Sequence, residues 1–267
     1  SSERIEKKKP ILKKLLDQLL QTYSYASILM TDSQGKDYSI SRQGINISPN
    51  MFVEQGYVVK VYDGESYGEY SFSRIEESDI DTILEEVKNH VMPWAKQLPD
   101  GMGIRKYPQI PDEEYQFDKS TEYEISPEDI GDEEIVKRLN ALREKALAQD
   151  EKILEFQTRF EYQVYHKLFL SPNKDMTQNV MWASGMLVGL IPKGEEMKMA
   201  FESCSDCGGM EVLDHLEEKI PHAVETLNRL AVSEPITPGE YECICAPDVT
   251  GMIVHEAFGH GVEMDMF

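Results

Sequence analysis

Residues 251–263 read Gly-Met-Ile-Val-His-Glu-Ala-Phe-Gly-His-Gly-Val-Glu and hold the sharpest pattern of the 267-residue sequence. Its core is His-Glu-x-x-x-His, in which His255, Glu256 and His260 are the chemically capable residues. The pattern is one residue longer than the His-Glu-x-x-His helix, whose two histidines bind zinc and whose glutamate activates water. A bare pattern of this kind arises by chance in about one chain per hundred of this size. Its glycines and its place after a predicted strand and turn favour a metal site.

The extra residue changes the geometry that the helix must adopt. An α-helix turns about 100° per residue, so histidines four apart lie roughly 40° apart around the axis and histidines five apart about 140°. On a regular helix, His255 and His260 cannot share one cation, so regularity here would make a shared metal site doubtful. The spacing therefore predicts an irregularity between Ala257 and Gly261. It is either a π-bulge or an unwound turn at Gly259 or Gly261, because glycine tolerates unusual backbone angles.

The residue types suit hydrolysis by an activated water. Neutral imidazole is a good zinc ligand, which makes His255 and His260 candidate metal ligands. Glu256 adjoins a ligand but points elsewhere, so it is the candidate general base, able to pass a proton from zinc-activated water to a leaving amine. Glu263 is a candidate either for orienting a histidine or for binding the metal itself.

The N-terminal part of the sequence alternates helical and strand patterns. Apolar residues at helical spacing predict helices at Arg4–Gln21 and Asp79–Leu98. Two hairpins are predicted between them. Their strands are residues 23–30 and 36–42, around a turn at Asp32–Gly35, and residues 56–62 and 67–72. Helices on an antiparallel sheet indicate an α+β unit.

The rest of the sequence predicts a second α+β region. Helices are expected at 132–149, at 212–232 with a break at Pro221, and from about Val249. Strands are expected at 153–160, 161–169, 176–191, 197–202 and 240–246, and a loop at 203–209.

The predicted fold class is α+β, with antiparallel or mixed sheets layered with helices. We expect an N-terminal α+β domain at 1–98, an acidic, proline-rich linker at 99–131, a second α+β region at 132–234, and the start of a C-terminal catalytic domain at 235–267. Since the sequence stops soon after the motif, that last part is expected to be truncated. The start at Ser1 rather than methionine suggests that an upstream segment or tag was removed.

Composition excludes several function classes. Lys and Arg number 27 against 49 Asp and Glu, for a formal net charge of −22. Such a surface repels phosphate backbones and anionic lipid, so direct nucleic-acid or membrane binding is not expected. No apolar stretch approaches the roughly 18 residues of a membrane span, and no secretory segment is present. A cytoplasmic protein is expected.

Weaker signals come from cysteine and histidine. The pairs Cys204/Cys207 and Cys243/Cys245 are separated by a whole predicted helix, which is longer than the usual zinc-ribbon spacing, so reduced thiols are expected rather than a structural metal. His215 and His222 lie seven apart on a predicted helix among glutamates, and they are interpreted as surface residues.

Residues 255–263 resemble the signature of the TldD/PmbA family, which combines the unusual spacing with a trailing Gly-x-x-Glu. The order of the predicted parts also agrees with that family. The resemblance implies a zinc peptidase acting on unfolded or flexible polypeptides, with His255 and His260 as Zn²⁺ ligands and Glu256 as the catalytic residue. It implies a homodimer, or a heterodimer with a paralogue lacking the motif. The family's third ligand is a cysteine downstream, beyond this sequence, so residues 1–267 alone are expected to be inactive.

Two other functions stay open at the level of sequence. One is a non-catalytic interaction subunit that regulates a partner through protein contacts, since the family has been described as a modulator of DNA gyrase. The other is a zinc hydrolase of another substrate class, such as an amidase.

Overall fold

The computed structural model describes residues 2–51, 53–97 and 106–263. Contacts divide the chain into two compact units, Ser1–Val232 and Ser233–Phe267. The first unit holds a sheet and most of the helices, and the second holds the helix with the histidine motif. None of the helices among the described residues has the length and hydropathy that a membrane crossing needs.

The first unit is built on one mixed sheet of eight described strands in the order β4-β3-β1-β6-β7-β5, with β2 beside β1 and β8 beside β7. The pairings among these strands are antiparallel except that of β5 with β7, which is parallel. The strands are β1 Tyr25–Ser41, β2 Gly44–Pro49, β3 Gln55–Tyr62, β4 Tyr67–Phe72, β5 Tyr115–Ser120, β6 Glu155–Leu170, β7 Lys174–Lys193 and β8 Glu196–Cys207.

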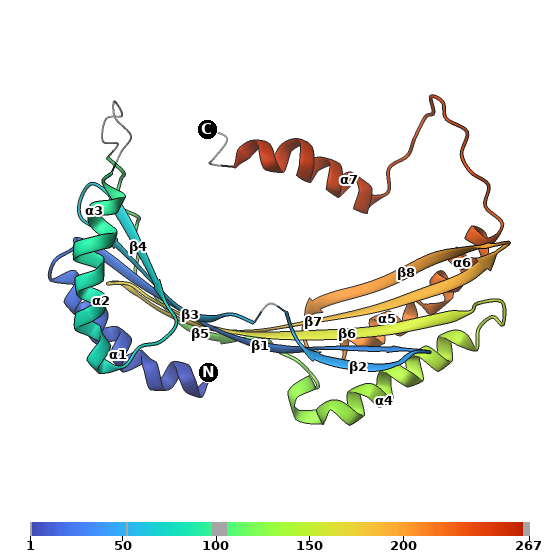
Figure 1. The fold of residues 1–267 in the computed structure, drawn as a ribbon, viewed down its shortest axis with the longest axis horizontal. Helices are drawn as coiled ribbons and strands as arrows, with labels where there is room; N and C mark the ends of the chain where they lie inside the picture. The colour runs from blue at the N-terminus through green and yellow to red at the C-terminus, as the bar shows by residue number, and fades with distance from the viewer. Residues whose placement is uncertain (1, 52, 98–105, 264–267) are drawn as a thin grey trace. The chain divides into compact units, whose positions relative to one another are not determined.

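Helices pack on this sheet in two groups (Figure 1). The first group lies beside the end formed by β3 and β4. It comprises α1 Glu3–Leu20, a 3₁₀ turn at Glu77–Asp79, α2 Ile80–Glu86, a π turn at Val87–Val91, and α3 Met92–Ala95. The second group lies along β6 to β8. It comprises α4 Pro127–Leu147, α5 Val212–Glu218 and α6 Ile220–Ala231. The predicted α+β class, with helices layered on a mixed sheet, is confirmed.

Both helix groups cover the same face of the sheet. Successive side chains of a strand point to opposite faces, and the β1 residues that belong to the two hydrophobic core clusters are all even-numbered. Ala26, Ile28 and Met30 join the core under α1, and Tyr38 and Ile40 join the core under α4. Strands β1 and β6 therefore carry both hydrophobic cores on one face, and the odd-numbered side chains of these two strands lie on the opposite face.

The predicted turn at Asp32–Gly35 is wrong, because β1 runs through it without interruption. Gly35 stands opposite Gln163 of β6, and a Cβ atom on Gly35 would lie 2.1 Å from the carbonyl oxygen of Tyr162. Glycine is needed here because a neighbouring strand approaches closely, not because the chain reverses. The predicted hairpin of strands 56–62 and 67–72 is confirmed as β3 and β4.

Other elements also differ from their sequence predictions. The segments 153–160 and 161–169 form one strand, β6, and the expected loop at 203–209 is partly the end of β8. The expected linker at 99–131 contributes β5 to the sheet, and its residues 99–105 lie outside the described part. The expected strand at 240–246 has no strand structure, because the described residues of the second unit place no other strand beside it.

Candidate metal site on the C-terminal helix

The helix that carries the motif changes its winding at the first histidine. Helix α7 spans Pro247–Val254, a π turn follows at His255–Gly259, and a 3₁₀ turn closes the segment at His260–Val262. The backbone N–H of His260 donates to the carbonyl of His255, five residues earlier, which is the hydrogen bond that defines a π turn. The predicted irregularity is thus confirmed in its π form. Gly259 stays helical, at φ −56° and ψ −52°, so the chain does not unwind there.

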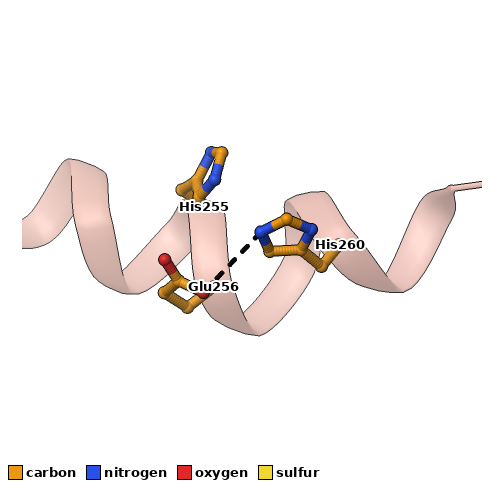
Figure 2. Close-up of side chains that lie close together, drawn as sticks. All are labelled: His255, Glu256 and His260. Atoms are coloured by element: carbon orange, nitrogen blue, oxygen red, sulfur yellow. Dashed lines mark ion pairs between the residues drawn. The ribbon is translucent and has the colours of Figure 1, made fainter.

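The wider turn brings the two histidines together. Their ring centroids lie 4.7 Å apart with the ring planes at 80°. One potential ligand atom from each of His255, Glu256 and His260 lies within 4.8 Å of the others (Figure 2). This is the only such group of three metal-binding side chains among the residues that the structure describes.

Two carboxylates hold His260. Glu263 Oε1 lies 2.8 Å from Nδ1 of the ring, and Glu256 Oε2 lies 3.7 Å from Nε2 (Figure 2 draws the latter pair). A carboxylate on Nδ1 favours the tautomer that carries its proton there, which leaves Nε2 free to bind a metal. Of the two roles predicted for Glu263, this geometry suits the orientation of a histidine.

The donor set fits zinc. Imidazole nitrogens and a carboxylate are ordinary zinc ligands, and two nitrogens on a tetrahedral zinc at about 2.05 Å would lie about 3.4 Å apart. All three side chains are exposed within this chain, so rotation about their side-chain bonds can close the remaining gap. His255 and His260 would hold the ion, while Glu256 faces the same space. A four-coordinate site would need further ligands from elsewhere.

The weaker sequence signals do not form a site in the described residues. The four cysteines are free thiols, and burial raises the pKa of Cys204, which disfavours a reactive thiolate. His222 contacts Glu202, and His215 lies 3.9 Å from Glu218, with both rings largely exposed. The interpretation of these histidines as surface residues agrees with the structure.

Known proteins resemble the chain in sequence over part of its length. No protein-family model matches. A metalloprotease of Archaeoglobus fulgidus is 29% identical over 141 residues, which are 52% of this chain and 32% of that protein. A metalloprotease of Methanothermobacter thermautotrophicus is 32% identical over 75 residues, 27% of this chain and 16% of that protein. The matched segments thus span a third or less of these relatives.

Solved structures resemble the chain over most of its length. A candidate modulator of DNA gyrase from Bacteroides thetaiotaomicron has a TM-score of 0.69 and 15% identity, over 95% of this chain and 56% of that one. A second candidate modulator of DNA gyrase, from Thermotoga maritima, has a TM-score of 0.64 and 13% identity, over 86% of this chain and 50% of that one. TldE from Thermococcus kodakarensis has a TM-score of 0.57 and 15% identity, over 82% of this chain and 47% of that one. At these identities the likeness concerns the fold.

Proposed function

The chain has the fold of the TldD/PmbA-type gyrase modulators, as its motif predicted, and from this premise we propose that it is the motif-bearing part of a zinc-dependent peptidase. The observation that carries the proposal is the π turn. It places the ring centroids of His255 and His260 4.7 Å apart, although the two residues are five positions apart in the sequence. The metalloprotease relatives support hydrolytic chemistry. They also make a purely non-catalytic subunit the less favoured alternative.

Each residue of the motif has a distinct part in the proposal. His255 and His260 hold the ion, and Glu263 keeps the His260 ring in the orientation that binding needs. Bound zinc would lower the pKa of a water molecule to about 7 and polarise a carbonyl group. Glu256 accepts the proton of the attacking water and then donates it to the leaving amine nitrogen. A third ligand, which the family resemblance places on a downstream cysteine, completes the site.

The proposed substrate is a peptide bond in an unfolded or flexible polypeptide. Both glutamates and both histidines of the motif are exposed, so an extended chain has access to them within this unit. The choice of substrate distinguishes a peptidase from an amidase. The peptidase proposal expects cleavage of an unfolded protein such as reduced casein, and an amidase would instead prefer small amides.

The first prediction concerns metal binding and cleavage in the complete protein. Glu256→Gln should keep one zinc per site and lose peptide cleavage by about 10²–10⁴-fold, because only the proton carrier is removed. His255→Ala and His260→Ala should each lose zinc. Metal content is measured by mass spectrometry of the purified protein, and cleavage by release of fluorescent peptide.

His222→Ala is the matched control, since His222 is an exposed histidine on α6, outside the motif. It should change neither zinc content nor cleavage. Retained cleavage in Glu256→Gln would remove that residue from its assigned role. A wild-type protein without stoichiometric metal would end the hydrolase proposal.

A further inference from the structure

Three neighbouring strands, β6, β7 and β5, align a row of polar side chains across the sheet. The register sets Lys167 of β6 opposite Gln178 of β7, which in turn stands beside Lys119 of β5. Residues paired in this way point their side chains to the same face. The odd-numbered side chains of β6 lie on the face opposite to the helices, so this lysine row (Lys167, Gln178 and Lys119) crosses that face.

Apolar rows lie on both sides of the lysine row. One of them aligns Phe169, Met176 and Phe117 across the same three strands, and the other aligns Tyr165 with Val180. All five side chains are partly exposed. Side chains two residues apart along a strand are about 6.7 Å apart. A ligand that lies along the lysine row can therefore contact both apolar rows, and we call the three rows together the platform.

The two ammonium groups of the platform contact aromatic rings instead of carboxylates. Lys167 Nζ lies 5.4 Å from the ring centroid of Tyr165, and Lys119 Nζ lies 5.4 Å from that of Phe117. An aromatic ring attracts a cation to its face, which holds both charges close to the sheet. In the described part of the chain, neither lysine has a carboxylate oxygen within salt-bridge distance. By contrast, every lysine of α1 contacts a carboxylate.

The platform differs in charge from the rest of the chain. None of its residues is acidic, although the sequence has 49 Asp and Glu against 27 Lys and Arg. Strand β1 continues the rows without an acid, because Thr31 stands opposite Lys167 and Leu29 opposite Phe169. The two lysines make this part of the surface positive on a chain whose formal net charge is −22. A positive patch attracts anionic groups.

We propose that the platform binds an acidic, extended segment of a partner polypeptide, which lies along the lysine row and crosses the strands. Neighbouring strands are about 4.8 Å apart, so Lys167 and Lys119, two strands apart, stand about 10 Å apart. A polyproline II segment rises about 3.1 Å per residue with three residues per turn, so its side chains at positions i and i+3 share one side about 9 Å apart. Carboxylates at these two positions match the two ammonium groups.

The residues between the two carboxylates match the apolar rows. In a polyproline II helix the side chains at i+1 and i+2 project to either side of the one at i, about 120° around the axis. Apolar side chains there lie toward Phe169, Met176 and Phe117 on one side and toward Tyr165 and Val180 on the other. Surfaces lined by aromatic residues bind such preformed segments at a low entropic cost. The partner segment therefore has the pattern acidic-apolar-apolar-acidic.

Single-stranded nucleic acid is another anionic ligand that lysines and aromatic side chains bind. Its affinity comes from contacts with many phosphates, whereas the platform offers two ammonium groups. The remaining surface of this acidic chain repels a ligand more strongly as the negative charge of that ligand grows. A segment with two carboxylates therefore suits the platform better than a nucleic acid does.

Fluorescence anisotropy of a labelled peptide on the 267-residue chain tests the proposal. The probe carries Glu-Leu-Pro-Glu between glycines, and the matched peptide has Gln in place of both Glu. The Gln peptide should bind about tenfold more weakly, since it loses two charge pairs. Lys167→Gln and Lys119→Gln should each weaken binding of the Glu peptide about threefold and leave binding of the Gln peptide unchanged. Phe117→Ala should weaken binding of both peptides, because it removes apolar contact.

Lys137→Gln is the control, since it removes the same charge from an exposed lysine of α4, outside the platform. It should leave binding unchanged, and circular dichroism checks that each variant is folded. The proposal is overturned if the Glu peptide shows no saturable binding up to about 1 mM, if the Gln peptide binds equally well, or if Lys137→Gln weakens binding as much as Lys167→Gln does. An oligothymidylate that binds more tightly than the Glu peptide would assign the platform to nucleic acid instead. His255→Ala should bind the Glu peptide as the wild type does, so this test is independent of the metal site.

Discussion

At the scale of the residue, Tyr38 shows how one buried hydroxyl joins a helix to the sheet. Tyr38 is 2% exposed, and its hydroxyl donates to Asp132 Oδ1 at 2.6 Å, while Lys36 Nζ lies 2.9 Å from the same oxygen. Asp132 follows Gly131, which kinks α4 at φ +80°. The hydrogen bond from Tyr38, followed by that from Lys36, lowers the pKa of Asp132. The kinked start of α4 is thereby held against β1.

We expect Tyr38→Phe to lower the free energy of unfolding by about 1 kcal/mol at pH 7, because the carboxylate loses a donor. A carboxyl whose pKa is lowered by folding adds stability that is present above its unfolded pKa of about 3.9 and is lost as the pH falls below it. The variant should therefore lose less stability than the wild type between pH 4 and pH 2. Urea unfolding across this range measures both effects.

Tyr57→Phe is the matched comparison. The Tyr57 hydroxyl is buried and has no hydrogen-bond partner among the described residues. An unpartnered buried hydroxyl costs stability, so its removal should leave the unfolding free energy unchanged or raise it. Equal losses in the two variants would show that the ring environment, and not the bond to Asp132, explains the effect of Tyr38→Phe.

At the scale of the element, the π turn at His255–Gly259 is what makes the motif a candidate site. The extra residue would turn His260 away on a regular helix, and the i to i+5 hydrogen bond returns it to His255. The site therefore depends on the number of residues between the histidines and on the winding that this number imposes. A change of one residue tests that dependence directly.

Deletion of Ala257 should preserve zinc binding, because the histidines then stand four apart and a regular α-helix brings them within about 40°. Insertion of one alanine after Ala257 should weaken binding by roughly 100-fold or more, since one ligand is turned away and even supporting contacts cost 10- to 100-fold. Competition with a chromophoric chelator on the complete protein measures both. Tight binding by the insertion variant would contradict the geometric argument.

At the scale of the whole molecule, the two hydrophobic cores of the first unit depend on the same strands. Strands β1 and β6 contribute buried side chains both to the core under α1 and to the core under α4. If β1 and β6 detached from the helices over one core, the apolar side chains of the other core would also become exposed to water. Residues 1–232 should therefore unfold as one cooperative body, although the sequence suggested two α+β regions.

Leu15→Ala and Leu139→Ala test this, since each leucine is 0% exposed in a different core. Each substitution should lower the free energy of unfolding by about 2–5 kcal/mol. Each variant should still show a single unfolding transition in urea, at a lower urea concentration and at the same midpoint by circular dichroism and tryptophan fluorescence. Val232→Ala, at a residue 77% exposed, should leave the midpoint unchanged. A second transition in either leucine variant would show that the cores unfold separately.

The local sequence pattern was enough to predict several helices and strands of this protein and the distortion of its last helix. Apolar spacing located α1 and the β3–β4 hairpin, because helical and strand periods depend on neighbours along the chain. Pro221 indicated the break between α5 and α6. The spacing of His255 and His260 required a distorted helix for the same reason, since the angle per residue is a property of the backbone alone. The roles proposed for the motif residues stay predictions.

Tertiary structure decided what depends on distant neighbours. The sequence shows Gly35 after Asp-Ser-Gln, a turn-like context, and only the approach of β6 reveals why glycine stands within a strand. The place of β8 beside β7, at an edge of the sheet that the described strands form, could not be foreseen either, because pairing depends on which strands meet across the sheet. Periodicity records which side of an element is buried. It carries no information on which backbone lies beside it, because hydrogen bonds between strands join residues far apart in the chain.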